Sequence, residues 1–159
     1  MKHATLEKWL KFVIIGMGFC GIFVYGWGLP NIISNLCYMH PEFTTWYYPC
    51  FLFLLITAIP CYGVLIYAWR IASNIGKGNA FSYDNGEAFR GISWMAATDT
   101  LFFFTGNVIA LLFNLNPLEY FLLSLILVFF GIAITLCAKA MAYLVDNAAD
   151  IQEENNGTI

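Results

Sequence analysis

Apolar residues fill four long runs of the chain, and short polar segments separate these runs. The runs cover approximately residues 12–29, 47–69, 92–113 and 120–145. Each contains roughly 20 residues or more, which lets an α-helix cross the ~30 Å hydrocarbon core of a bilayer. Helices are expected because lipid leaves backbone polar groups without any other partner. The pattern therefore predicts an all-α integral membrane protein with four transmembrane helices, and Pro60 predicts a kink in the second one.

Basic residues indicate which side of the membrane each connection occupies. They precede the first run, separate the second from the third, and end the fourth, whereas residues 30–46 and 114–119 contain no Lys or Arg. Because cytoplasmic connections are enriched in Lys and Arg, we predict an antiparallel bundle over residues 1–145 with both termini in the cytoplasm. A cytoplasmic hairpin would cover residues 70–91, and an acidic, flexible cytoplasmic tail would cover residues 146–159. The basic residues behind this orientation are Lys2, Lys8, Lys11, Arg70, Lys77, Arg90 and Lys139.

The composition excludes an ordinary soluble domain and offers no enzyme signature. Hydrophobic residues make up 60% of the chain and charged residues 11%, whereas soluble domains carry about 25% charged residues. The five cysteines form no CxxC pair and no Cys/His cluster, so we expect neither a metal site nor a cofactor. Cys37 and Cys50 could share one side of the membrane, and we expect free thiols there. His3 and His40 would lie on opposite sides, and we expect no enzyme.

Two ionisable residues form a predicted intramembrane polar pair, Asp99 in the third run and Lys139 in the fourth. An ionised group at such depth costs about 2.5–3.5 kcal/mol on insertion scales, so these side chains should face the bundle interior. Asp99 could be a proton or cation site with Thr98, Thr100 and Asn107 as polar neighbours. It could instead be protonated and hydrogen-bonded, or it could form an ion pair with Lys139. Lys139 could also extend to the membrane interface.

Gly76, Lys77 and Gly78 raise the question of a phosphate-binding loop within the hairpin. The P-loop pattern needs a glycine where this chain has Ile71 and a Ser or Thr where it has Gly78, so nucleotide binding is not expected. We predict instead that one helix ends at Gly76 in the left-handed conformation and that the next begins after an N-cap at Ser82. The exposed face of this hairpin would contact a cytosolic partner through Lys77, Phe81, Asp84, Asn85, Glu87 and Arg90.

A longer pattern also spans the hairpin. It reads I-x-x-G-x-x-F-S-x-x-N-x-x-x-F-R-x-I and is carried by Ile75, Gly78, Phe81, Ser82, Asn85, Phe89, Arg90 and Ile92. This pattern resembles the cytoplasmic signature of a bacterial membrane family, domain of unknown function 2975, whose members commonly carry Leu in place of Phe89. The resemblance implies a small protein with four helices, of which this chain would be nearly the whole length. Genes of this type often neighbour a small helix-turn-helix regulator, so the resemblance also implies a membrane protein that binds or restrains a transcription factor.

Three functions are compatible with these observations. The first is a non-enzymatic protein of the bacterial inner membrane that binds or restrains a small helix-turn-helix regulator through the hairpin, without contacting nucleic acid itself. The second is a small transporter or ion-coupled accessory subunit that uses Asp99. The third is a structural or immunity-type partner of another membrane complex. A transporter would usually show more intramembrane polar groups or an inverted repeat, so we favour the first.

Overall fold

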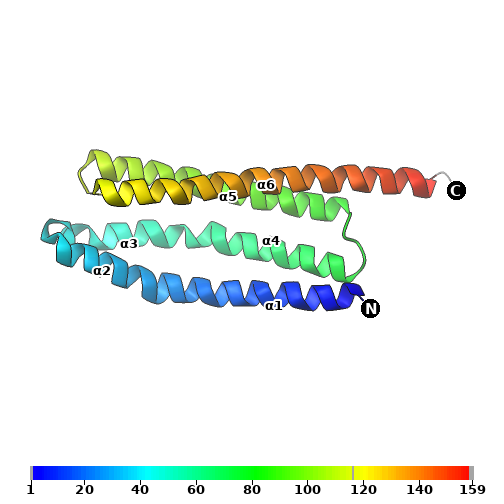
Figure 1. The fold of residues 1–159 in the computed structure, drawn as a ribbon, viewed down its shortest axis with the longest axis horizontal. Coiled ribbons are helices and arrows are strands. Elements are labelled where there is room, and N and C mark those ends of the chain that lie inside the picture. The colour runs from blue at the N-terminus through cyan, green and yellow to red at the C-terminus, as the bar shows by residue number, and fades with distance from the viewer. Residues whose placement is uncertain (1, 116, 158–159) are drawn as a thin grey trace.

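Helices account for almost the whole described chain. The computed structural model describes residues 2–115 and 117–157, and no strand occurs within these ranges. Figure 1 shows the arrangement of these helices. In chain order they are α1 (Lys2–Phe23), the π-helical turn η1 (Val24–Gly28), α2 (Leu29–Met39), the 3-10 helix η2 (Pro41–Trp46), α3 (Tyr47–Ile56), α4 (Ala58–Gly76), α5 (Tyr83–Leu112) and α6 (Leu118–Gly157).

Four helical segments are long and apolar enough to cross a membrane, which confirms the predicted number of spans. They cover His3–Met39, Pro41–Gly76, Tyr83–Leu112 and Leu118–Asn155. These segments lie side by side along the long axis, and both chain ends lie at one end of the molecule (Figure 1). Most of their large apolar side chains are exposed, as is expected of a surface whose solvent is lipid.

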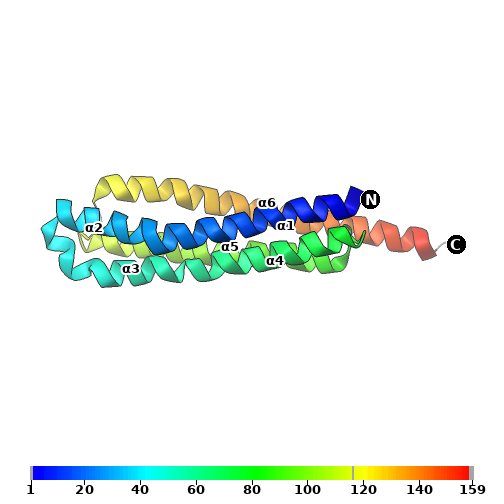
Figure 2. The same cartoon turned by 90° about the horizontal axis from the view of Figure 1, so that it is seen from below.

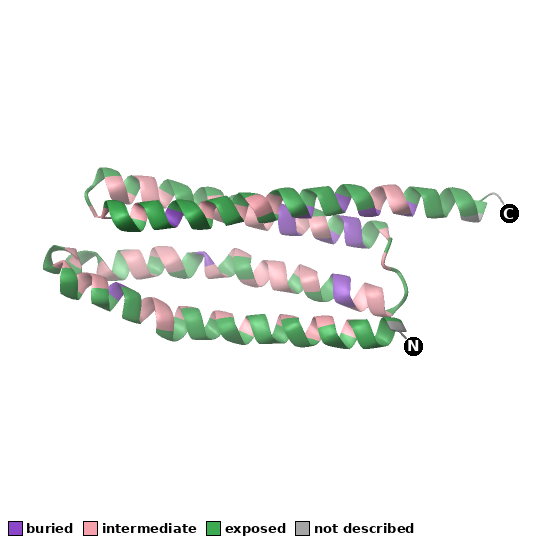
Figure 3. Cartoon of the chain, viewed as in Figure 1, coloured by how far each residue is buried: buried purple, intermediate pink, exposed green. Residues whose placement is uncertain are grey.

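The buried core lies toward the hairpin end of the molecule. Ile71 of α4, Ala88 and Ile92 of α5, and Ala138 of α6 form a buried cluster. Figure 3 shows most of the buried segments of α5 and α6 toward this end. The helices pack in the order α1 on α4, α4 on α5 and α5 on α6. Alanines at the α5–α6 contact let the two backbones approach closely, as small residues commonly do in membranes.

Glycines extend this close packing along α5 and α6. A Cβ atom at Gly131 of α6 would overlap the side chain of Thr100 of α5, and a Cβ atom at Gly91 of α5 would overlap the ring of Tyr67 of α4. Glycine therefore fits both contacts as they stand, because a Cβ atom would require the neighbouring side chain or its helix to move.

The structure differs from the predicted connections in two places. Residues 30–39 and 41–46 are helical, in α2 and η2, and His40 between them is not. Pro41 lies in the first turn of η2, where a missing N–H breaks no hydrogen bond. The acidic segment predicted to be a flexible tail continues α6 as far as Gly157. Its side chains contact α5, as described below, and residues 158–159 lie outside the described part of the chain.

Candidate functional site

The hairpin turns at Gly78 and not at Gly76. Gly78 has a φ of 82°, its N–H donates to the carbonyl of Ile75 at 3.0 Å, and the N–H of Asn79 donates to the carbonyl of Asn74 at 3.0 Å. This pair of bonds is the Schellman arrangement that ends many helices. The prediction for Gly76 is wrong because α4 keeps its helical conformation through Gly76, and the left-handed residue comes two positions later.

Asn85 holds the two ends of the hairpin together. Its side chain is fully buried, with 0% of the residue exposed. The Nδ2 group donates to the carbonyls of Asn79 (3.2 Å) and Ala80 (2.9 Å), and Oδ1 accepts from Nδ2 of Asn74 (2.8 Å). The carboxamide thus joins the last turn of α4, the connecting loop and the first turn of α5. This corrects the expectation that Asn85 contacts a partner, because all of its hydrogen bonds are made inside the hairpin.

Ser82 starts α5, as predicted, through its backbone. Its φ of −130° and ψ of 151° are extended, and its carbonyl accepts from the N–H groups of Asn85 (2.9 Å) and Gly86 (3.1 Å). The hydroxyl is buried without a hydrogen-bond partner among the described residues, so it does not act as the side-chain cap. Asp84 lies in the first turn of the helix, where a negative charge suits the helix dipole.

Charged side chains cover the outer surface of the hairpin. The Arg70 guanidinium lies 3.5 Å from both the Asp84 and the Glu87 carboxylates, and all three side chains are exposed. Exposed ion pairs of this kind contribute only about 0–1 kcal/mol, so a partner can rearrange them at little cost. Lys77 is exposed, and Phe81 exposes 60% of its surface. Of the predicted contact residues, Asn85 is therefore buried and the other five are exposed.

The acidic end of α6 packs against the start of α5. We call residues 146–157 the α6 extension. Arg90 forms an ion pair with Asp146, and the Tyr83 hydroxyl donates to Asp150 (2.6 Å) and approaches Glu153 (3.5 Å). The spacing of these three acidic residues places them on one helix face. In the sequence, this spacing was the signal that residues 146–157 form a helix with one acidic face. The acidic, weakly apolar composition instead led to the prediction of a flexible tail.

The structure does not bring the predicted intramembrane pair together. Lys139 is exposed on α6, and no ion pair between described residues includes Lys139 or Asp99. Thr98, Thr100 and Asn107, the predicted polar neighbours of Asp99, each donate a side-chain hydrogen bond to a backbone carbonyl of α5, the helix that carries them.

Asp99 instead adjoins a polar cluster that the sequence did not reveal. Tyr25, on η1, has its hydroxyl 3.1 Å from Oγ1 of Thr57 and 3.6 Å from Sγ of Cys61. The Cys61 thiol lies 3.9 Å from Oδ2 of Asp99. Thr57 interrupts the second span between α3 and α4, just before Pro60, as a proline-induced break requires. A π-helical turn and a broken helix thus meet at one polar cluster, and such irregularities are frequent at functional sites.

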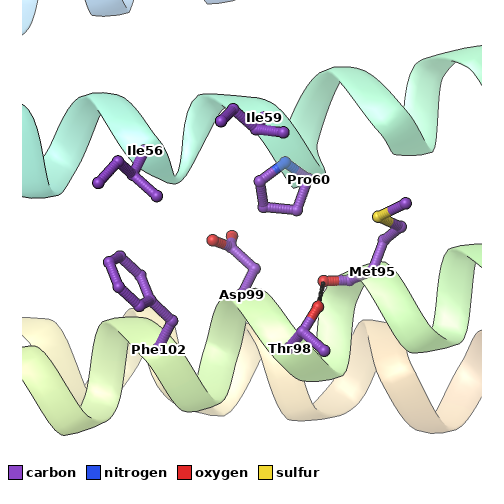
Figure 4. Close-up of a pocket in the computed structure, with 7 residues that line it drawn as sticks. All are labelled: Ile56, Ile59, Pro60, Met95, Thr98, Asp99 and Phe102. Carbon is purple, nitrogen blue, oxygen red and sulfur yellow. Dashed lines mark hydrogen bonds between the residues drawn. The ribbon is translucent and has the colours of Figure 1, made fainter.

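A groove of about 270 Å³ lies beside Asp99. Figure 4 shows the carboxylate pointing from α5 toward the broken part of the second span. Asp99 supplies the charge in this groove and Thr98 a hydroxyl group. The remaining walls are apolar and consist of Ile56, Ile59, Pro60, Met95 and Phe102.

The cysteines and the possible metal ligands were the other candidate functional groups. All five cysteines are free in the structure, and the Cys37 thiol contacts the carbonyl of Phe43 at 3.6 Å. Within residues 2–115 and 117–157, no group of three or more His, Cys, Asp or Glu side chains is arranged to hold a metal ion.

Comparisons with known proteins agree with the hairpin pattern. The family described as "Protein of unknown function (DUF2975)" matches residues 32–159. The chain is also 26% identical over 160 residues to "Uncharacterized membrane protein YoaS" of Bacillus subtilis (strain 168), and the match covers 99% of each chain. No solved structure matches. With four helices able to span a membrane, the chain is a multi-pass bacterial membrane protein, and it belongs to the DUF2975 family.

Proposed function

We propose that this chain is a non-enzymatic protein of the bacterial inner membrane that binds a basic cytosolic partner, a small helix-turn-helix transcription regulator. In this proposal the four spans form an antiparallel bundle, and the distribution of Lys and Arg supports a cytoplasmic location for both termini and for the hairpin. The docking surface consists of the exposed face of the hairpin together with the α6 extension.

The α6 extension carries this proposal. It projects beyond the ends of the other helices in both Figure 1 and Figure 2. The segment that follows Lys139 contains no Lys or Arg, and its acidic side chains are Asp146, Asp150, Glu153 and Glu154. Its helical form, with contacts to Tyr83 and Arg90, gives these charges fixed positions. The molecule thus presents an ordered negative surface at one end.

A DNA-binding regulator has the complementary chemistry. Its DNA-contacting face carries Lys and Arg that neutralise phosphates, and an acidic helix can occupy that face through opposite charge. Occupying the face would keep the regulator off DNA. The exposed ring of Phe81 supplies an apolar anchor beside the charges, as is typical of protein–protein contacts.

The test uses variants that remove charge without removing the contacts that order the extension. Asp150→Asn and Glu153→Gln together keep an oxygen acceptor for the Tyr83 hydroxyl. We expect the detergent-extracted double variant to lose co-purification with the helix-turn-helix regulator encoded beside its gene, because the attraction depends on charge. The matched control is Glu119→Gln, an exposed carboxylate at the opposite end of α6. Equal recovery of the regulator by the double variant and this control would refute the proposed surface.

A further inference from the structure

The Asp99 carboxylate is a charged group with too few partners. Its Oδ1 atom is buried and accepts no hydrogen bond from the described residues. Within the described ranges, its Oδ2 atom has the thiol of Cys61 as its hydrogen-bond partner, at 3.9 Å. A carboxylate can accept about four hydrogen bonds, and an ionised group in apolar surroundings is costly unless it is paired. The site therefore lacks a compensating positive charge.

No ion pair between described residues includes Asp99. Lys11 pairs with Glu7, Arg70 pairs with the hairpin acids, and Arg90 pairs with Asp146 on the α6 extension. Lys139, on α6, is exposed. Ion pairs between described residues thus leave Asp99 unmatched, and a cation that balances its ionised form would come from outside the chain.

The groove defines which kind of cation fits. Its walls are almost entirely apolar and its volume is about 270 Å³, slightly below the range of pockets for drug-sized ligands. Phe102 lies on one side of the carboxylate and Ile59 on the other side of the groove (Figure 4). An aromatic face attracts organic ammonium groups. A bare divalent ion is poorly suited, because Ca²⁺ and Mg²⁺ take six or so oxygen ligands and this groove offers one carboxylate.

We propose that this groove binds a small lipophilic organic cation from the membrane. Its ammonium group pairs with Asp99, and its apolar body lies against Ile59 and Phe102. The Cys61 thiol, which also contacts the Tyr25 hydroxyl, lies 3.9 Å from Oδ2, whereas the buried Oδ1 has no hydrogen-bond partner among the described residues, so a cation in the groove would balance the charge of the carboxylate as a whole. This site lies within the spans and uses none of the residues of the proposed regulator surface, so each proposal can fail without the other.

Binding of benzyltrimethylammonium to the full-length protein tests the proposal. The protein is placed in nanodiscs of zwitterionic phospholipid, and binding is measured by isothermal titration calorimetry. We expect saturable binding at one site per chain. Asp99→Asn keeps the shape of the side chain but removes its charge, and it should weaken binding at least about tenfold. Glu119→Gln removes an exposed carboxylate outside the groove and should bind as the unmodified protein does.

A second variant tests the groove independently of the charge. Ile59 exposes 72% of its surface, so Ile59→Trp should fill the groove without disturbing buried packing. We expect it to weaken binding at least about tenfold although Asp99 is intact. The proposal is overturned if the unmodified protein shows no saturable binding, if Asp99→Asn binds equally well, or if Ile59→Trp has no effect. If Asp99→Asn fails to fold, the binding measured for Ile59→Trp still tests whether the cation occupies this groove.

Discussion

Replacing Asn85 with alanine should lower the free energy of opening the hairpin while the turn at Gly78 is retained. The side chain is fully buried and takes part in three hydrogen bonds, one from Asn74 and one each to the carbonyls of Asn79 and Ala80. The alanine variant removes all three and leaves their partners without a replacement inside the protein. Gly78, which sets the turn, is unaffected by the change.

The magnitude follows from these three bonds. Each intramolecular hydrogen bond contributes about 0.5–1.5 kcal/mol net, so losing three should lower the free energy of opening the hairpin by about 3 kcal/mol. That difference is roughly a 150-fold change in an equilibrium constant. Asn74→Ala removes one of the bonds and should lower the opening free energy by about 1 kcal/mol. Asn79→Ala keeps its backbone carbonyl and is the matched control.

Amide hydrogen exchange measures this opening directly. The N–H of Gly86 bonds to the carbonyl of Ser82 at 3.1 Å, and it is released when the first turn of α5 opens. We expect its exchange in the detergent-extracted protein to be fastest in Asn85→Ala, intermediate in Asn74→Ala and nearly unchanged in Asn79→Ala. If Asn85→Ala exchanges at the rate of Asn79→Ala, the buried carboxamide does not stabilise the hairpin.

Three further changes test the packing, the turn and the α6 extension. Gly131→Val should force α6 away from Thr100 and destabilise the protein by about 1–3 kcal/mol, seen as earlier loss of the monodisperse peak on heating. Gly16→Val, where a Cβ meets nothing within 4 Å, is its control. Gly78→Ala places a side chain at a φ of 82° and should cost about 1–2 kcal/mol, measured by the same heating series. Tyr83→Phe removes the hydrogen bond to the extension, so amide exchange should accelerate there while α5 stays protected; unchanged exchange would mean that the extension is held by other contacts.

The spans were predictable because the property that defines them is local. A run of about 20 apolar residues matches the thickness of a bilayer whatever the rest of the chain does. The α6 extension was not predictable in this way, because its acidic composition is typical of flexible tails. Its helical form is accompanied by tertiary contacts with Tyr83 and Arg90, and these residues are more than 50 positions away in the sequence.

The same distinction holds for the candidate sites. The pattern shows that Asp99 lies within a span and that Pro60 breaks one, because both statements depend on nearby residues. The rotation and the vertical position of each helix decide which residues meet Asp99, and hydropathy contains neither quantity. Tyr25 and Cys61 therefore came to light only in the structure.

Most residues of the hairpin pattern in this chain hold the hairpin together and do not form a binding face. Gly78 makes the turn, Asn85 joins the two helix ends, and Ile92 lies in the buried cluster. Arg90 pairs with the α6 extension but stays half exposed, and Phe81 exposes 60% of its surface. In the proposed function, the ordered charges of the α6 extension lie outside this pattern, and we propose that they select the partner.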